Sequence, residues 1–202
     1  GELFLHIGVT LYETVLGFVL GTAAGTLIAI ALWWSPAINR VLDPYLVVLN
    51  ALPKIALGPI LIVWFGAGIT SIIVMALLIS FVVTIMSVLA GFNEITGEKQ
   101  LLMKTLGASK LQIFTMVVLP ASLPTIMNAL KISVGMSWVG VIVGEYLVSK
   151  AGLGYLIVYG GQVFKLDLVM ASIVVLCLLA ALMYYGVAYM EKKLVKWRMH
   201  GG

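Results

Sequence analysis

Long runs of uncharged, apolar residues constrain the fold of this chain more than any other feature. Residues 69–92 contain no charged side chain, and several other runs approach or exceed the roughly 20 residues that cross the hydrocarbon core of a bilayer. The runs do not alternate between apolar and polar residues as the strands of a membrane β-barrel do. Because 62% of the 202 residues are hydrophobic and only 10% are charged, an all-α, polytopic membrane protein is predicted.

Five membrane spans are predicted. They cover residues 10–34, 45–65, 69–92, 123–148 and 167–190. The second is a broken span, because Pro53 and Pro59 remove backbone hydrogen bonds and bend a helix. The glycine-rich residues 149–165 are too polar to span, so they are interpreted as a short re-entrant or interfacial segment. Residues 1–202 are expected to form a single transmembrane domain.

Three glycines recur at helical spacing in the first span. Gly17, Gly21 and Gly25 lie at positions i, i+4 and i+8, which places them on one face of a helix. Such a stripe of small residues allows a second helix to approach closely within a membrane. It is therefore a candidate helix-packing surface. The alternative is that glycines are simply common in membrane helices.

The basic residues predict the orientation of the chain. Eight of the twelve gather at alternate span ends, and Lys150 and Lys165 lie at the opposite ends; the eight are Arg40, Lys99, Lys104, Lys110, Lys192, Lys193, Lys196 and Arg198. Basic loops stay in the cytoplasm. Residues 98–120 and the C-terminus are thus expected inside and the N-terminus outside, an unusual start that predicts a further, preceding span. The net charge of +4 is interpreted as loop anchoring at the lipid surface, not as nucleic-acid binding.

Residues 98–120 form the one long amphipathic stretch. Its leucines recur at helical spacing opposite Lys104. Gly107 is suited to end this helix, because glycine readily takes a positive φ. Ser109 and Gln112 then form a capping-box pattern that starts a second helix, which meets Pro120. The pattern predicts a helix, a glycine turn and a helix at the membrane surface, where a partner protein would act.

No sequence motif for catalysis or nucleotide binding is present. The chain lacks a phosphate-binding Gly-x-x-x-x-Gly-Lys-Ser/Thr loop, a His-Glu-x-x-His zinc motif and a cysteine cluster, and Cys177 is its single cysteine. His6 and His200 belong to no local motif. The protein is therefore expected not to be an enzyme, to bind no metal or cofactor itself, and to depend on a partner for any nucleotide.

The amphipathic stretch resembles the cytoplasmic loop of bacterial ABC-importer permeases. Their signature is Glu-Ala-Ala, three residues, Gly, nine residues and Ile-x-Leu-Pro. Gly107 and residues 117–120 match it with the spacing intact, whereas Leu101, Leu102 and Met103 replace the triplet. TLGAS at 105–109, LPASLP at 119–124, NALPKIALGPILIVWFG at 50–66, and the segments around Glu145 and Gly152 resemble the branch that imports nitrate, taurine, alkanesulfonates or bicarbonate.

The resemblance implies a type I importer permease core with a cytoplasmic coupling helix, in the bacterial inner membrane. Such a subunit forms the path for a small anion and pairs with an identical subunit or a close paralogue. Two cytoplasmic ATPases, which bind ATP and Mg²⁺, and an external solute-binding protein complete the assembly. The coupling residues would be Leu101, Leu102, Met103, Gly107, Ala108, Ser109, Leu119 and Pro120.

Other interpretations remain open. The amphipathic stretch is also compatible with a helix resting on lipid, given its three lysines. The whole chain is compatible with an ATP-independent secondary transporter or channel, or with a membrane scaffold that does not transport. Candidate path residues are Lys131, Ser137, Trp138 and Glu145, because polar groups within spans tend to face a bundle interior or a water-filled route. Lys131 could instead extend to the membrane surface, and Glu145 could help to hold a gate. Ser137 and Trp138 could have no role beyond packing between helices.

Overall fold

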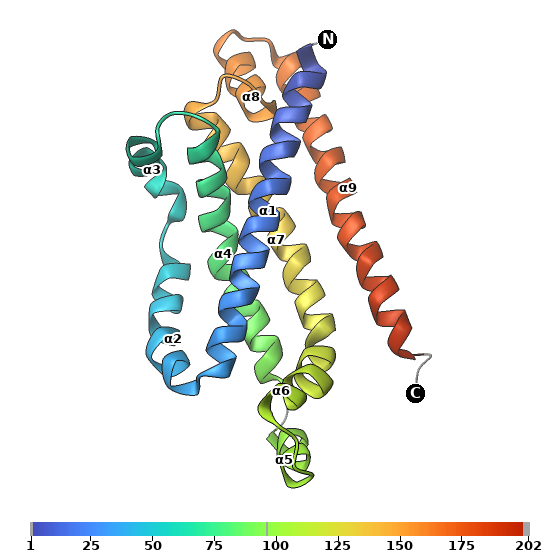
Figure 1. Cartoon of the computed structure of the whole chain (residues 1–202). Coiled ribbons are helices and arrows are strands. Elements are labelled where there is room, and N and C mark those ends of the chain that lie inside the picture. The colour runs from blue at the N-terminus through green and yellow to red at the C-terminus, as the bar shows by residue number, and fades with distance from the viewer. Residues whose placement is uncertain (1, 96, 200–202) are drawn as a thin grey trace.

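The protein is described by a computed structural model that covers residues 2–95 and 97–199, with side chains described for residues 3–95 and 97–194. His200 and the side chains of Lys196 and Arg198, which enter the orientation prediction, lie outside this description. Four long helices run side by side along the molecule (Figure 1): α1 (Glu2–Trp34), α4 (Ile69–Asn93), α7 (Leu119–Val148) and α9 (Leu166–Met199).

Shorter helices connect the long ones. They are α2 (Pro36–Ala51), α3 (Gly58–Phe65), α5 (Gly97–Thr105), α6 (Lys110–Ile113) and α8 (Leu153–Gln162), with a 3₁₀ turn at Lys54–Leu57 and a π-helical turn at Phe114–Val118. The helices α5 and α6 lie at one end of the bundle, and α8 lies near the N-terminus at the opposite end (Figure 1). We refer to these as the hairpin end and the α8 end.

The prediction of an all-α protein with about five spans is confirmed. Four helices are long and apolar enough to cross a membrane, and a fifth crossing results if the bent pair of α2 and the Lys54–Phe65 segment counts as one span. The pair bends by 82°. The bend lies at Pro53, which cannot donate a backbone hydrogen bond. The break in the second span is therefore at a proline that the sequence analysis identified.

Small residues bring α1, α4 and α7 together. A methyl group placed on Gly17 would lie 2.8 Å from the Cβ atom of Ala76, and one on Gly25 would lie 2.9 Å from that of Thr84. One placed on Gly140 of α7 would overlap Ala76 from the other side. The helix α4 is therefore held at backbone distance between α1 and α7, which is how helices gain packing energy in lipid. The hydroxyls of Thr84 and Ser133 also hydrogen-bond across α4 and α7, at 2.7 Å.

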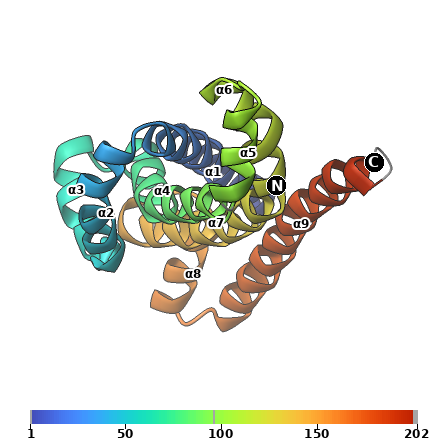
Figure 2. The same ribbon diagram turned by 90° about the horizontal axis from the view of Figure 1, so that it is seen from below.

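The helix α9 diverges from this three-helix core toward the hairpin end (Figure 2). It packs on α7 through a small apolar cluster around Trp138 and Val187. Its other faces carry exposed apolar side chains, among them Leu178, Leu182 and Tyr185. Such an apolar exterior is suited to lipid or to another membrane helix.

Some helix ends differ from the prediction. The helix α1 begins at Glu2, eight residues before the predicted span. A helix can extend beyond the membrane core, and the composition of residues 2–9 does not mark where the span begins. The helix α7 begins at Leu119 and passes through Pro124 without ending. A proline near the start of a helix removes few hydrogen bonds, since the first N–H groups have no intrahelical acceptor. The segment at residues 149–165, interpreted from the sequence as a short re-entrant or interfacial segment, contains the short helix α8.

Candidate functional site

Gly107 turns the chain sharply between α5 and α6. Its φ is +80°, a region that side chains disfavour. The N–H of Gly107 donates to the carbonyl of Lys104 at 3.0 Å, and the N–H of Ala108 donates to that of Met103 at 3.0 Å. These two bonds form a Schellman motif, which satisfies the last carbonyls of α5. The glycine turn predicted from the sequence is present.

A capping box begins α6 two residues later. The Ser109 hydroxyl accepts a hydrogen bond from the Gln112 N–H at 3.3 Å, and the Gln112 side-chain oxygen accepts one from the Ser109 N–H at 2.8 Å. Both bonds of the predicted box are therefore formed. Together, the two motifs fix the direction of the chain on both sides of Gly107 and make the turn well defined.

A π-helical turn leads from α6 into α7. The N–H of Leu119 donates to the carbonyl of Phe114, five residues earlier. Pro120 follows and has no N–H, so the carbonyl of Met116 lacks its usual α-helical donor. Single π-helical turns are rare, and those that occur within α-helices are frequently at functional sites. We call α5, α6 and this turn, residues 97–118, the hairpin.

The hairpin exposes several large apolar side chains. Leu101 and Leu102 are each 61% exposed, and Leu106 is 74% exposed. Two more exposed apolar side chains follow in the second half, Leu111 and Met116. Within the predicted triplet only Met103 turns inward, where it packs with Ala108 on the core cluster. An exposed apolar patch of this kind usually marks a contact surface.

The hairpin is also fixed to the ends of α1 and α4. The Lys110 ammonium donates a hydrogen bond to the Trp34 carbonyl at 2.5 Å and lies 5.5 Å from the ring centres of Trp33 and Trp34. Phe114 packs against both tryptophans and against Phe92 of α4. A displacement of the hairpin would therefore be passed directly to two of the three core helices.

A second polar site lies at the α8 end. Glu145 of α7 is only 1% exposed, and its carboxylate accepts hydrogen bonds from the Thr10 hydroxyl at 2.6 Å and from the Gly154 N–H at 2.5 Å. The Thr10 hydroxyl oxygen accepts a further bond from the Leu153 N–H at 2.7 Å. One carboxylate thus joins α1, α7 and the first turn of α8.

His6 adds another link at this end. Its Nδ1 atom accepts a hydrogen bond from the Gly152 N–H at 2.9 Å, and its ring stacks on Tyr155 of α8 at a centroid distance of 5.8 Å. Gly152 has a φ of +118°, and a methyl group there would overlap the Glu145 carboxylate. This position therefore requires glycine, both for its backbone conformation and for space.

Glu13 is the functional candidate that the sequence reasoning missed. It is 0% exposed, it lies near Glu145, and neither of its oxygens has a hydrogen-bond partner among the described residues. The sequence nevertheless contains a signal for it. Glu13 is an ionisable residue inside the predicted first span, just as Lys131 and Glu145 are ionisable residues inside the predicted span at 123–148.

The four candidate path residues do not converge on one point. Lys131 forms an ion pair with Glu191 of α9 at 2.8 Å, near the hairpin end. Ser137 and Trp138 are buried between helices, and neither the Ser137 hydroxyl nor the Trp138 N–H has a partner among the described residues. Lys131 and Glu145 are separated by about 21 Å along α7, from 14 residues at 1.5 Å each.

The comparisons with known proteins agree on one family. The family described as "Binding-protein-dependent transport system inner membrane component" matches residues 17–196. The chain is 31% identical over 199 residues to the taurine transport system permease protein TauC of Escherichia coli (strain K12), covering 98% of this chain and 72% of TauC. It is 32% identical over 198 residues to the putative aliphatic sulfonates transport permease protein SsuC of Bacillus subtilis (strain 168), with the same coverage of 98% and 72%.

Two further similarities extend this picture. The formylaminopyrimidine transport permease protein ThiX of Halalkalibacterium halodurans is 31% identical over 195 residues, covering 96% of this chain and 78% of ThiX. A chain of the MetNI methionine ABC transporter, solved in inward facing conformations, superposes with a TM-score of 0.76 at 20% identity, covering 96% of this chain and 94% of that one. At 20% identity, the similarity to the MetNI chain shows the fold alone.

Proposed function

The chain belongs to the family of binding-protein-dependent transport system inner membrane components, and on that premise we propose that it is the transmembrane subunit of an ATP-driven importer of a small anion. Two copies, or one copy and a close paralogue, line the path. An external binding protein delivers the solute, and two ATPase subunits that bind ATP and Mg²⁺ drive the cycle. The hairpin and the C-terminus face the cytoplasm of a bacterial cell, as the basic residues indicate.

One observation carries this proposal: the hairpin exposes leucines and is nevertheless fixed to the core. Leu101, Leu102 and Leu106 would enter an apolar groove of the ATPase, in the manner of other helix-in-groove contacts. A helix that merely rests on lipid needs no Schellman motif, capping box or anchor to α1. The wholly apolar residues at the triplet positions favour a more hydrophobic contact with the ATPase than the Glu-Ala-Ala signature provides.

The anchor of the hairpin supplies a route for the ATP-driven movement. Closure of the ATPases would push the hairpin as a rigid body, and Lys110 and Phe114 would transmit the push to α1 and α4. Because α7 packs against α4 at backbone distance, the three core helices would tilt together. Alternating access to the two sides of the membrane would follow from this rocking motion.

The polar site at the α8 end would hold the outer side of the path in one of its two states. Glu145 of α7 hydrogen-bonds both α1 and the start of α8, so a common tilt of the core helices must either break the bond to α8 or move α8 with them. We therefore assign Glu145 to the outer gate. Lys131 belongs to the contact between α7 and α9 through its ion pair with Glu191, and Ser137 and Trp138 remain candidates for the path.

The names of the relatives narrow the class of solute. Two of them are named for taurine and for aliphatic sulfonates, which are small organic sulfonates. We therefore propose an organic sulfonate as the solute, ahead of nitrate or bicarbonate. Another relative is named for formylaminopyrimidine, so the external binding protein must make the final selection.

Reconstitution tests this function. The permease is purified with its ATPase subunit, placed in proteoliposomes with the binding protein inside or outside, and supplied with labelled taurine. The proposal predicts uptake that requires both ATP and the binding protein. Taurine movement by the permease alone, without ATP, would instead support a secondary transporter or channel. A stable permease complex that moves no solute under any condition would favour a scaffold.

A further inference from the structure

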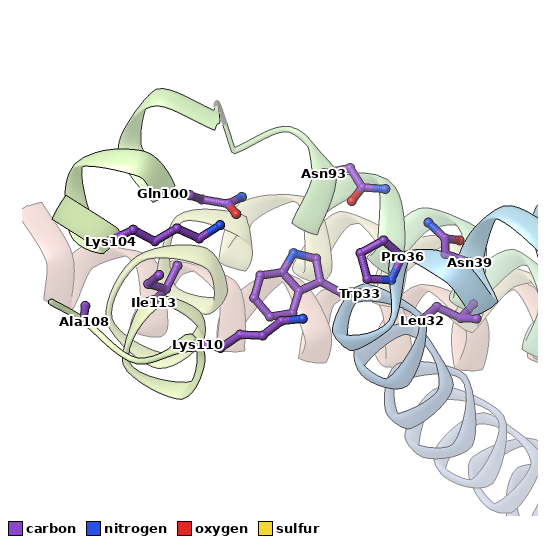
Figure 3. A pocket seen from close by; sticks show the side chains of 10 residues that line it. All are labelled: Leu32, Trp33, Pro36, Asn39, Asn93, Gln100, Lys104, Ala108, Lys110 and Ile113. Carbon is purple, nitrogen blue, oxygen red and sulfur yellow. The ribbon is translucent and has the colours of Figure 1, made fainter.

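A cavity of about 370 Å³ lies at the hairpin end, between the hairpin and the corner where α1 meets α2. Ten side chains line it, all labelled in Figure 3: Leu32, Trp33, Pro36, Asn39, Asn93, Gln100, Lys104, Ala108, Lys110 and Ile113. Nine of them come from α1, α2, α4, α5 and α6, and Ala108 lies in the turn between α5 and α6. Its volume falls within the range of small-molecule sites, which begins at about 300 Å³.

The polar groups of the lining are suited to a negative charge. Lys104 and Lys110 each place an ammonium group at the cavity, from the two halves of the hairpin (Figure 3). Three carboxamides, those of Asn39, Asn93 and Gln100, complete the polar lining. None of the described side chains that line the cavity is a carboxylate, so nothing in the lining competes for the two ammonium groups.

These polar groups retain hydrogen-bonding capacity. An ammonium group has three donors, and Lys110 uses one of them on the Trp34 carbonyl. Lys104 makes no side-chain hydrogen bond or ion pair within the described part of the chain. The side-chain oxygen of Asn39 is buried without a partner among the described residues. Buried polar atoms are normally paired, and an oxygen acceptor can be paired only by a donor, so this atom favours a ligand that carries a hydroxyl or amino group beside its anionic group.

We propose that this cavity binds a tetrahedral oxyanion, the phosphate or sulfonate group of a small amphiphile. Lys104, Lys110 and the carboxamide NH2 groups would donate to its oxygens, and the Asn39 side-chain oxygen would accept a hydrogen bond from a ligand hydroxyl or amino group. The Trp33 ring and Leu32 offer an apolar wall for the organic part of the ligand. The site lies outside the exposed leucine face of the hairpin, so it goes beyond the proposed contact with the ATPase.

Two sources could supply this chemistry. Tryptophans such as Trp33 and Trp34 favour the headgroup level of a membrane, where an anionic phospholipid presents its phosphate. A soluble sulfonate on the same side of the membrane offers the same three oxygens. A ligand from either source would bridge the hairpin and the α1–α2 corner, and would thus stiffen the joint through which the hairpin moves.

Binding to the intact permease–ATPase complex tests the proposal and distinguishes the sources. In one arm, native mass spectrometry counts the phosphatidylglycerol retained by a complex taken from nanodiscs of phosphatidylglycerol and phosphatidylcholine. In the other, sodium methanesulfonate is titrated against sodium chloride of equal ionic strength in pure phosphatidylcholine nanodiscs, with thermal stability as the readout. Neither arm requires transport, so a failure here leaves the importer assignment untouched.

Three variants assign the binding to this cavity. Lys104→Gln removes one ammonium group, and Gln100→Glu adds a negative charge without removing a lysine. Lys192→Gln makes the same charge change as Lys104→Gln on the exposed part of α9. Phosphate sites of the ATPase also bind anions, but they are the same in all three variants. A difference in binding between the variants therefore reports on the cavity.

The expected result for Lys104→Gln and Gln100→Glu is a loss in one of the two arms: fewer retained phosphatidylglycerol molecules in the first, or an affinity for methanesulfonate lower by about tenfold or more in the second, since a hydrogen bond to a charged group contributes at least that factor. Lys192→Gln should bind as the unsubstituted complex does. Loss in the phosphatidylglycerol arm identifies a lipid, and loss in the methanesulfonate arm identifies a soluble anion. If both cavity variants bind as Lys192→Gln does in both arms, the proposal is wrong.

Discussion

The ammonium of Lys110 donates a 2.5 Å hydrogen bond to the backbone carbonyl of Trp34, which joins the second half of the hairpin to the last residue of α1. These residues are separated by 76 positions in the sequence, so the bond connects two otherwise distant parts of the chain. It satisfies a carbonyl at a helix C-terminus, where a positive charge is favourable. The proposed coupling depends on contacts of this kind, because a surface helix can push a bundle only through them.

Removal of this link should weaken coupling more than assembly. Lys110→Met keeps the length of the side chain but loses the hydrogen bond to Trp34. The hairpin retains its leucine face, so the permease should still purify with the ATPase. We expect ATP hydrolysis stimulated by the binding protein to fall several-fold. Lys99→Met, at an exposed lysine of α5, is the control and should keep the stimulation.

The exposed leucine face should be required for assembly. Leu102→Asp places a charge on a side chain that is 61% exposed, so the permease itself should fold and reach the membrane normally. A charge in an apolar groove is costly, however, and the ATPase subunit should no longer co-purify. Leu102→Met, which conserves apolar volume, should keep the complex. Recovery of an intact complex with Leu102→Asp would show that this face does not bind the ATPase.

The glycine stripe of α1 permits a matched test of helix packing. Gly21→Val would place its Cβ atom 2.5 Å from the Ser80 hydroxyl of α4, whereas Gly8→Val in the same helix meets nothing within 4 Å. The first substitution must displace the Ser80 side chain or separate α1 from α4, and the second changes only intrinsic helix propensity. We expect Gly21→Val to lower the melting temperature of the purified permease clearly and Gly8→Val to leave it nearly unchanged. Equal melting temperatures would count against the close approach.

The buried carboxylate at the α8 end should be important for stability. Glu145→Ala leaves the Gly154 N–H without its acceptor, which costs about 1–3 kcal/mol for a buried donor. Glu145→Gln retains one acceptor oxygen and should be intermediate in a thermal unfolding assay. Glu98→Ala removes an exposed carboxylate from α5 and is the control. Unchanged unfolding of Glu145→Ala would mean that α8 is held by other contacts.

The fold and the hairpin could largely be predicted from the sequence because their signals are local. Uninterrupted apolar runs identify spans, Pro53 identifies the bend after α2, and the glycine and capping-box residues identify the turn at Gly107. Each of these signals depends on residues within a few positions of one another. Their physical causes, a missing N–H or a positive φ, act on the backbone directly.

The long-range pairs could not be predicted in this way. Nothing near Lys131 in the sequence indicates that it pairs with Glu191, 60 residues later, and the same holds for Glu145 and Thr10, 135 residues apart. Helix faces are compatible with many neighbours, so their partners depend on how the spans pack. Glu13 is a different case: the general expectation for a charge within a span applied to it, but its position near Glu145 emerged only from the packing of α1 on α7.

The most direct test of the central claim is ATP hydrolysis by the reconstituted complex with Gly107→Val. Gly107 has a φ of +80° and open space around it, so a β-branched residue there strains only the backbone, by about 1–2 kcal/mol, and redirects the hairpin. Gly97→Val is the matched control, because Gly97 also has open space and no positive φ. We predict that Gly107→Val loses the stimulation of ATP hydrolysis by the solute-loaded binding protein, while Gly97→Val keeps it. Full stimulation in an assembled Gly107→Val complex would contradict the assignment of the hairpin as the coupling element.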